Sequence, residues 1–96
     1  MTREAQDFLK EYTPKSNMYT SKEEIELISN ELGLEGMTTE DFQPLRNEVV
    51  RLYTELLDKN IIINDKGEYV GRTEKYWSLM NAMQSVTAVI DHYIYK

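Results

Sequence analysis

Apolar residues recur at helical spacing in four stretches of the chain, and one segment between the third and fourth stretches breaks that period. The four stretches predict helices at about residues 3–12, 21–32, 43–59 and 74–95. The intervening segment joins three consecutive isoleucines to a glycine-containing turn, which predicts a small two-stranded hairpin. We therefore expect a mainly α (α+β) fold, one domain over residues 1–96, with about four helices and a hairpin between helices three and four.

Polar residues mark the ends of these helices. Ser21 and Glu24 have the spacing of a capping box, in which each side chain bonds the backbone N–H of the other. Gly33 suits the left-handed residue that follows a helix, so the second helix is expected to end at residue 32. Thr73 is placed to cap the last helix.

The third helix has an apolar seam that alternates spacings of three and four. Pro44 is expected at its first position, where the missing N–H costs nothing, with an optional turn before it at 39–42. Two heptads are too few for a free coiled coil, so the seam should face the core. The seam consists of Phe42, Leu45, Val49, Leu52 and Leu56. The predicted core consists of Ile25, Ile28, Leu32, Leu45, Val49, Leu52, Leu56, Met80, Met83, Val86 and Ile90.

The hairpin has two interpretations. Ile61, Ile62 and Ile63 favour an extended strand, and residues 64–67 fit a type I turn closed by a left-handed glycine. Because a lone hairpin is marginal in water, we expect it to lie on the helices as a clip, with its isoleucines covering them and its turn exposed. The alternative is a wing that contacts DNA.

The last helix is apolar around more than half of its circumference, which is typical of a helix buried in a core or against a partner. We expect an interface on this helix, carried by Trp77, Met80, Tyr93 and Ile94, and a homodimer formed through it. The alternative is that this helix is the central helix of a monomer.

The chain contains no cysteine, which excludes disulfides, thiolate nucleophiles and cysteine-bound metals. The sequence lacks the basic start and following apolar run that would indicate a secretory signal, and no apolar stretch is long enough to span a bilayer. We therefore expect a cytoplasmic, intracellular protein with no membrane contact.

Few residues could support catalysis. His92 is the only histidine, so neither a histidine metal cluster nor a histidine-assisted nucleophile is available. Gly67 and Gly71 do not fit the glycine of a calcium-binding loop, and no phosphate-binding glycine loop occurs. We expect a protein that is not an enzyme, with no cofactor and no metal.

The net charge of −6 is unevenly distributed. Residues 1–58 carry thirteen acidic and six basic side chains, whereas residues 59–96 carry four and five. An acidic body suits docking on a basic surface of another protein, including a nucleic-acid channel. Small acidic inhibitors of nucleic-acid enzymes, common on phages and mobile elements, have this character. We therefore favour a protein-binding, regulatory module, with Glu23, Glu24, Glu26 and Glu31 at its interface.

The alternative function is DNA binding. The order of helix, helix, helix, hairpin and helix resembles that of a winged helix-turn-helix transcriptional regulator, which implies that helix 43–59 and hairpin 61–70 would contact DNA. The contacts would come from Gln43, Arg46, Asn47, Arg51, Lys66 and Arg72. Segment 59–73 nets only +1, less than a phosphate-binding wing usually carries.

Overall fold

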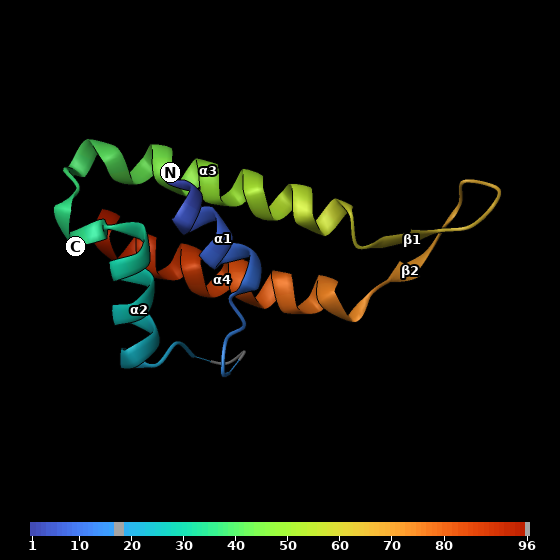
Figure 1. The fold of residues 1–96 in the computed structure, drawn as a ribbon, viewed down its shortest axis with the longest axis horizontal. Helices are drawn as coiled ribbons and strands as arrows, with labels where there is room; N and C mark the ends of the chain where they lie inside the picture. Colours follow the sequence, from blue (N-terminus) through green and yellow to red (C-terminus); the bar gives the residue numbers. More distant parts are fainter. Residues whose placement is uncertain (17–18, 96) are drawn as a thin grey trace.

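The body of the molecule is a pair of long antiparallel helices, α3 (Thr39–Asp58) and α4 (Glu74–Ile94), on which two short helices pack (Figure 1). The computed structural model describes residues 1–16 and 19–95. Within these ranges the remaining elements are α1 (Arg3–Glu11), α2 (Lys22–Leu32), the 3-10 turn η1 (Leu34–Gly36), β1 (Ile61–Ile63) and β2 (Tyr69–Arg72). The strands form an antiparallel hairpin between α3 and α4. The predicted class is therefore confirmed: the fold is mainly α with one small hairpin.

Polar side chains begin and end the helices at the expected residues. The Ser21 hydroxyl accepts the N–H of Glu24 at 3.2 Å, and the Glu24 carboxylate accepts the N–H of Ser21 at 3.5 Å, which confirms the capping box. Gly33 ends α2 with φ +67°, a conformation that strains any residue with a Cβ. Thr73 caps α4 by accepting the N–H of Tyr76 at 3.3 Å.

The start of α3 differs from the prediction for Pro44, which lies inside the helix and not at its first position. The N–H of Thr38 donates to the Asp41 carboxylate at 3.0 Å, and this cap starts the helix at Thr39. Pro44 therefore lacks the N–H that would bond the carbonyl of Glu40. Both residues are exposed, so water can take that bond.

The buried apolar side chains form one cluster, contributed by all four helices and η1. Of the predicted core, the residues at Ile28, Leu32, Leu45, Val49, Val86 and Ile90 are buried; Leu52, Leu56, Met80 and Met83 are half-buried against the cluster; and Ile25 is exposed. The predicted core is thus confirmed at its centre and wrong at its margins.

The buried side of α3 departs from the predicted seam in the second half of the helix. Tyr53 and Leu57 are buried where Leu52 and Leu56 were expected. Tyr53 and Leu57 directly follow Leu52 and Leu56 in the sequence, and either pair could lie in an apolar core. The sequence pattern alone therefore does not decide which pair is buried. The observed row runs at spacing four, and such a row is inclined to the helix axis. It turns the buried side of α3 towards α1.

Tyr53 makes the contact that selects this register. Its side chain is fully buried, and its hydroxyl donates to the carbonyl oxygen of Leu9 at 3.1 Å. Leu9 lies in the last turn of α1, where carbonyls have no partner within the helix. Burial raises the pKa of the Tyr53 hydroxyl, so the group remains a donor. The phenol therefore both fills the core and completes the end of α1, which a leucine could not do.

The hairpin is a projecting arm, and the prediction that it is a clip is wrong (Figure 1). It extends beyond α3 and α4 along the long axis of a molecule that measures 48 × 25 × 24 Å. Ile62 and Ile63 are exposed and cover no helix. At its base, Thr73 donates its hydroxyl to the Asn60 side-chain oxygen at 2.8 Å and its N–H to the Asn60 carbonyl at 3.0 Å. These bonds tie the two helix ends together, and the chain between them leaves the body.

The turn of the arm has the predicted form. The N–H of Gly67 donates to the Asn64 carbonyl at 2.9 Å, and Gly67 has φ +80°. The side-chain oxygen of Asn64 also accepts the N–H groups of Lys66 and Glu68, each at 2.9 Å. The arm therefore holds its shape by local bonds. Throughout the described ranges, no helix has both the length and the apolar character required to cross a membrane.

Candidate protein-binding surfaces

The outer face of α2 carries three exposed carboxylates around one exposed leucine, and we call Glu23, Glu26, Leu27 and Glu31 the α2 face. Glu23, Glu26 and Glu31 are exposed, as the sequence predicts. Leu27 lies one helical turn from both Glu23 and Glu31, and 43% of it remains exposed. Ile25, expected in the core, is instead 38% exposed; two positions before Leu27, it lies on the opposite side of the helix, towards α4. Leu27 adds apolar area to an otherwise charged helix face, so we take this face as a candidate contact surface.

Ile25 stands between two hollows in the surface. One, of about 180 Å³, is also lined by Val89 and His92 from α4. The other, of about 390 Å³, is also lined by Glu26 and Tyr93. Because Glu26 of the α2 face lines the second hollow, a partner docked on that face could also place a side chain against Ile25.

Glu24 does not belong to this surface, and its assignment to the interface is wrong because the residue is buried. Its carboxylate accepts hydrogen bonds from the Tyr12 hydroxyl at 2.6 Å, the Lys15 N–H at 3.3 Å and the Ser21 hydroxyl at 3.2 Å. The bond from Tyr12, with help from the backbone donors, lowers the pKa of Glu24 despite its burial. Glu24 therefore fastens the segment after α1 to the start of α2.

The arm is the second apolar surface. Ile62, Ile63, Tyr69 and Val70 are each about half exposed, between 45% and 56%. The register shifts between Ile62 and Ile63, where the partner strand has an extra residue. Within the described residues each strand has a neighbour on one side only, so both outer edges of the hairpin leave backbone groups unpaired. The arm is thus free to contact another chain by side chain and by backbone.

An arginine–aromatic cluster joins the arm to α4. The Arg72 guanidinium carbon lies 4.8 Å from the ring centre of Tyr76, 5.4 Å from that of Trp77 and 5.6 Å from that of Tyr69. The rings of Tyr76 and Trp77 meet edge to face at 5.4 Å. Aromatic faces attract a cation at these distances. Arg72, expected on the wing as a DNA contact, is therefore engaged within the protein.

The interface predicted on α4 is exposed at only one of its four residues. Trp77 is 54% exposed, whereas Met80, Tyr93 and Ile94 are half-buried against the core cluster. The ring of Tyr93 lies 5.5 Å from that of Phe42 on α3. Most of the apolar circumference of α4 is therefore used inside the monomer, and the exposed part lies beside the arm.

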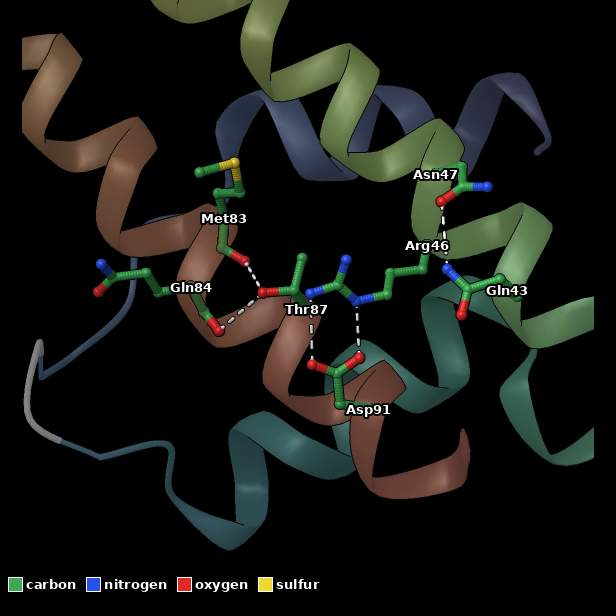
Figure 2. Close-up of polar contacts among 7 residues, drawn as sticks. All are labelled: Gln43, Arg46, Asn47, Met83, Gln84, Thr87 and Asp91. Carbon is green, nitrogen blue, oxygen red and sulfur yellow. Dashed lines mark hydrogen bonds and ion pairs between the residues drawn. The ribbon is translucent and has the colours of Figure 1, made fainter. Parts of the chain in front are cut away.

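The polar side chains of α3 that were expected to contact DNA form hydrogen bonds within the protein (Figure 2). Arg46 donates from Nε and from one terminal nitrogen to the two carboxylate oxygens of Asp91, at 2.6 and 3.4 Å. These bonds to the carboxylate raise the pKa of Arg46 and hold its side chain against α4. Gln43 donates to the Asn47 side-chain oxygen at 3.2 Å, and both residues are exposed.

The other candidate DNA contacts are scattered. Arg51 is exposed but shares a shallow hollow with Glu48 and Glu55 of the same helix, so its charge stands among carboxylates. Lys66 is exposed at the turn of the arm and is distant in sequence from the candidate DNA contacts on α3. Of the six predicted DNA contacts, Gln43, Arg46, Asn47 and Arg51 share α3, but Arg46 is paired with Asp91 and Arg72 is held by aromatic rings.

The described part of the chain contains no group of three or more histidine, cysteine, aspartate or glutamate side chains placed to hold a metal. His92 is exposed, and its ring meets the ring of Tyr93 edge to face at 6.1 Å.

Each of the two surfaces corresponds to a feature that is visible in the sequence. Leu27 is an apolar residue flanked by glutamates at spacing four, and the arm residues carry apolar side chains on both strands of a two-stranded sheet. Comparison of the chain with protein-family models, with curated proteins and with solved structures found no match, so the surfaces are interpreted from their own chemistry.

Proposed function

We propose that the protein is a small acidic protein-binding module that regulates its partner by docking the α2 face on a basic surface. The observation that carries the proposal is the placement of exposed Leu27 among the exposed Glu23, Glu26 and Glu31, with Ile25 in a hollow beside Glu26. Apolar side chains that lose water at the centre of a contact supply most of its affinity. Carboxylates around them speed the encounter and select for a basic partner.

Leu27 on the α2 face and Ile25 in the adjoining hollow can contribute a useful share of the affinity. Full burial of a leucine or isoleucine is worth roughly 1.5–3 kcal/mol. Since 43% of Leu27 and 38% of Ile25 remain exposed, burying the remainder is worth about 0.6–1.2 kcal/mol each. A partner that covers Leu27 and also fills the hollow beside Glu26, where Ile25 lies, would bind roughly 10- to 50-fold more tightly than one that covers neither residue.

The charge distribution supports a partner that itself binds nucleic acid. Sites for nucleic acid are lined with lysine and arginine that neutralise phosphates. An acidic module docked there would compete with the nucleic acid, which is how small acidic inhibitors of the phage and mobile-element type act. The absence of cysteine fits work in a reducing, intracellular compartment. We propose a binding role and not a catalytic one.

Duplex DNA is the second candidate ligand, because the arm projects at the end of α3 as a wing projects beside a recognition helix. The engagement of the basic side chains argues against it: Arg46 is paired with Asp91, and Arg72 is surrounded by aromatic rings. Titration of duplex DNA at low salt and again at higher salt tests this alternative. A steep salt dependence whose slope falls by about one in Arg51→Gln would favour DNA.

Charge reversal tests the α2 face. Glu26→Lys/Glu31→Lys alters it, and Asp7→Lys/Glu11→Lys makes the same change in net charge on exposed residues of α1. Each immobilised full chain captures proteins from a lysate of the cells that produce it, and affinity is then measured with the purified captured protein. We expect the α2 variant to bind at least about tenfold more weakly and the α1 control to bind like wild type. Equal binding by both variants would refute the assignment of the α2 face.

A further inference from the structure

The arm presents an apolar surface that the α2 face does not use. Its half-exposed side chains continue onto the start of α4, where Trp77 is 54% exposed. Arg72 holds the rings of Tyr69 and Trp77 beside each other, because its guanidinium lies within 5.6 Å of both ring centres. The surface comprises Ile62, Ile63, Tyr69, Val70 and Trp77.

The area of this surface matches what a stable dimer requires. An aromatic side chain offers about 150–250 Å², so Tyr69 and Trp77, each about half exposed, leave roughly 200 Å² in water. The three aliphatic residues leave about as much again. A standard interface buries about 800 Å² per partner, of which about 60% is apolar. The arm and Trp77 therefore supply most of the apolar area that one half of such an interface needs.

The backbone of the arm is also suited to a copy of itself. Both strands are edge strands, and an edge strand offers unpaired N–H and C=O groups to a strand of another chain. Native proteins usually protect such edges with charges or with a covering element. Here the strand residues of β1 are three isoleucines, and β2 has one charge, Arg72, which the aromatic rings hold.

The charge distribution favours contact through the arms over contact through the bodies. Residues 1–58 carry seven more acidic than basic side chains, so two bodies repel each other. Segment 59–73 carries three basic side chains and two acidic ones, so two arms meet with little repulsion. Because the arm and α2 lie at opposite ends of a molecule 48 Å long, arm-to-arm contact keeps the two acidic α2 helices well beyond a Debye length of about 8 Å from each other.

We propose that two copies of this chain form a homodimer through their arms, about a twofold axis, with Ile62, Ile63, Tyr69, Val70 and Trp77 buried between them. A twofold contact uses the same surface on both subunits, as a near-neutral apolar arm can. The dimer leaves the α2 face of each copy exposed, so each dimer presents two docking faces on separate bodies.

The single tryptophan of the chain reports on this contact directly, because Trp77 lies in it. Sedimentation equilibrium of the full chain across micromolar and submillimolar concentrations gives the mass, and tryptophan emission over the same series gives the burial of Trp77. We expect a shift from monomer to dimer mass and a blue shift of the emission at the same concentrations.

Two matched variants locate the contact. Val70→Lys puts a charge on the arm, and Leu27→Lys puts the same charge on the α2 face at a residue of similar exposure. We expect Val70→Lys to weaken dimerisation at least about tenfold, while Leu27→Lys dimerises like wild type but captures less partner. A monomer mass at every concentration, or a dimer whose tryptophan emission does not move, would overturn the proposal. Either result leaves the capture experiment on the α2 face unchanged, so the two proposals fail separately.

Discussion

Replacing Leu57 by alanine should destabilise the protein at least twice as much as replacing its neighbour Leu56. Leu57 is 8% exposed, whereas Leu56 is half-buried on the side of α3 next to the core. The two substitutions delete the same atoms from adjacent positions of one helix, so intrinsic helix propensity changes equally. The difference between the two losses of unfolding free energy therefore shows which side of the second half of α3 is buried.

The magnitudes follow from burial. Leucine to alanine in a closed core costs about 2–5 kcal/mol, as lost transfer free energy plus the cavity that remains. Leu57 lies in the last turn of α3, where neighbouring side chains can relax, so we expect the lower part of that range, about 2–3 kcal/mol. At Leu56 about half of the transfer free energy is lost and no closed cavity forms, so we expect about 1 kcal/mol.

Urea unfolding followed by the helical circular dichroism signal gives both free energies, provided that the m value stays constant. The refuting result is a cost for Leu56→Ala that equals or exceeds that for Leu57→Ala. The buried row would then run through Leu52 and Leu56, and Tyr53 would not reach the carbonyl of Leu9. The arm, which follows directly after α3, would also leave the body in another direction.

Tyr53→Phe should cost about 1–3 kcal/mol in the free energy of unfolding, because it leaves the carbonyl of Leu9 unpaired inside the core; calorimetry that finds no fall in Tm would contradict this. Hydrogen bonding lowers the pKa of Glu24 below its ordinary value of 4.5, so the ionised group stabilises the fold above that pH and this contribution is lost as the pH falls through the lowered pKa. The difference in stability between wild type and Glu24→Gln, measured by urea unfolding, should therefore be largest near neutral pH and shrink in acid; a constant difference would count against it. Arg72→Gln should accelerate amide hydrogen exchange in the arm, while the unfolding free energy changes by no more than about 0.5 kcal/mol; unchanged exchange would mean that the cation–π contacts do not order the arm.

The parts of the fold that could be predicted from sequence are those set by neighbours in the chain. Ser21 and Glu24 form the expected capping box, Gly33 is left-handed, and Asn64 and Gly67 form the expected turn. Each of these features depends on residues about three positions apart, so tertiary packing has little to add.

The register of α3 could not be predicted, because the sequence offers an apolar residue at both candidate positions in each turn. Tyr53 is selected over Leu52 by a carbonyl of α1, which is 44 residues away in sequence. The direction of the arm escaped prediction for a similar reason. Whether Ile62 and Ile63 cover a helix depends on the path of the chain after α3, and it is α1 and α2 that pack on the helix pair.

Of the candidate surfaces, only the acidic residues of the α2 face could be predicted, since they follow from charge counting. Glu24 was wrongly placed at the interface because its carboxylate, besides capping α2, also accepts a hydrogen bond from the Tyr12 hydroxyl. That bond holds Glu24 in the protein interior. The sequence shows that Leu27 lies between two glutamates, each one helical turn away. This spacing places Leu27 on the outer face only once the buried residues of α2 are known.

The most direct test of the proposed function is the backbone amide spectrum of the isotope-labelled full chain as the purified captured protein is added. The account predicts that the largest chemical-shift changes fall on residues 23–31 of α2 and on the neighbouring end of α4 around His92, with residues 43–51 of α3 unchanged. Shift changes concentrated on residues 43–51 and at Lys66, with α2 unaffected, would contradict it.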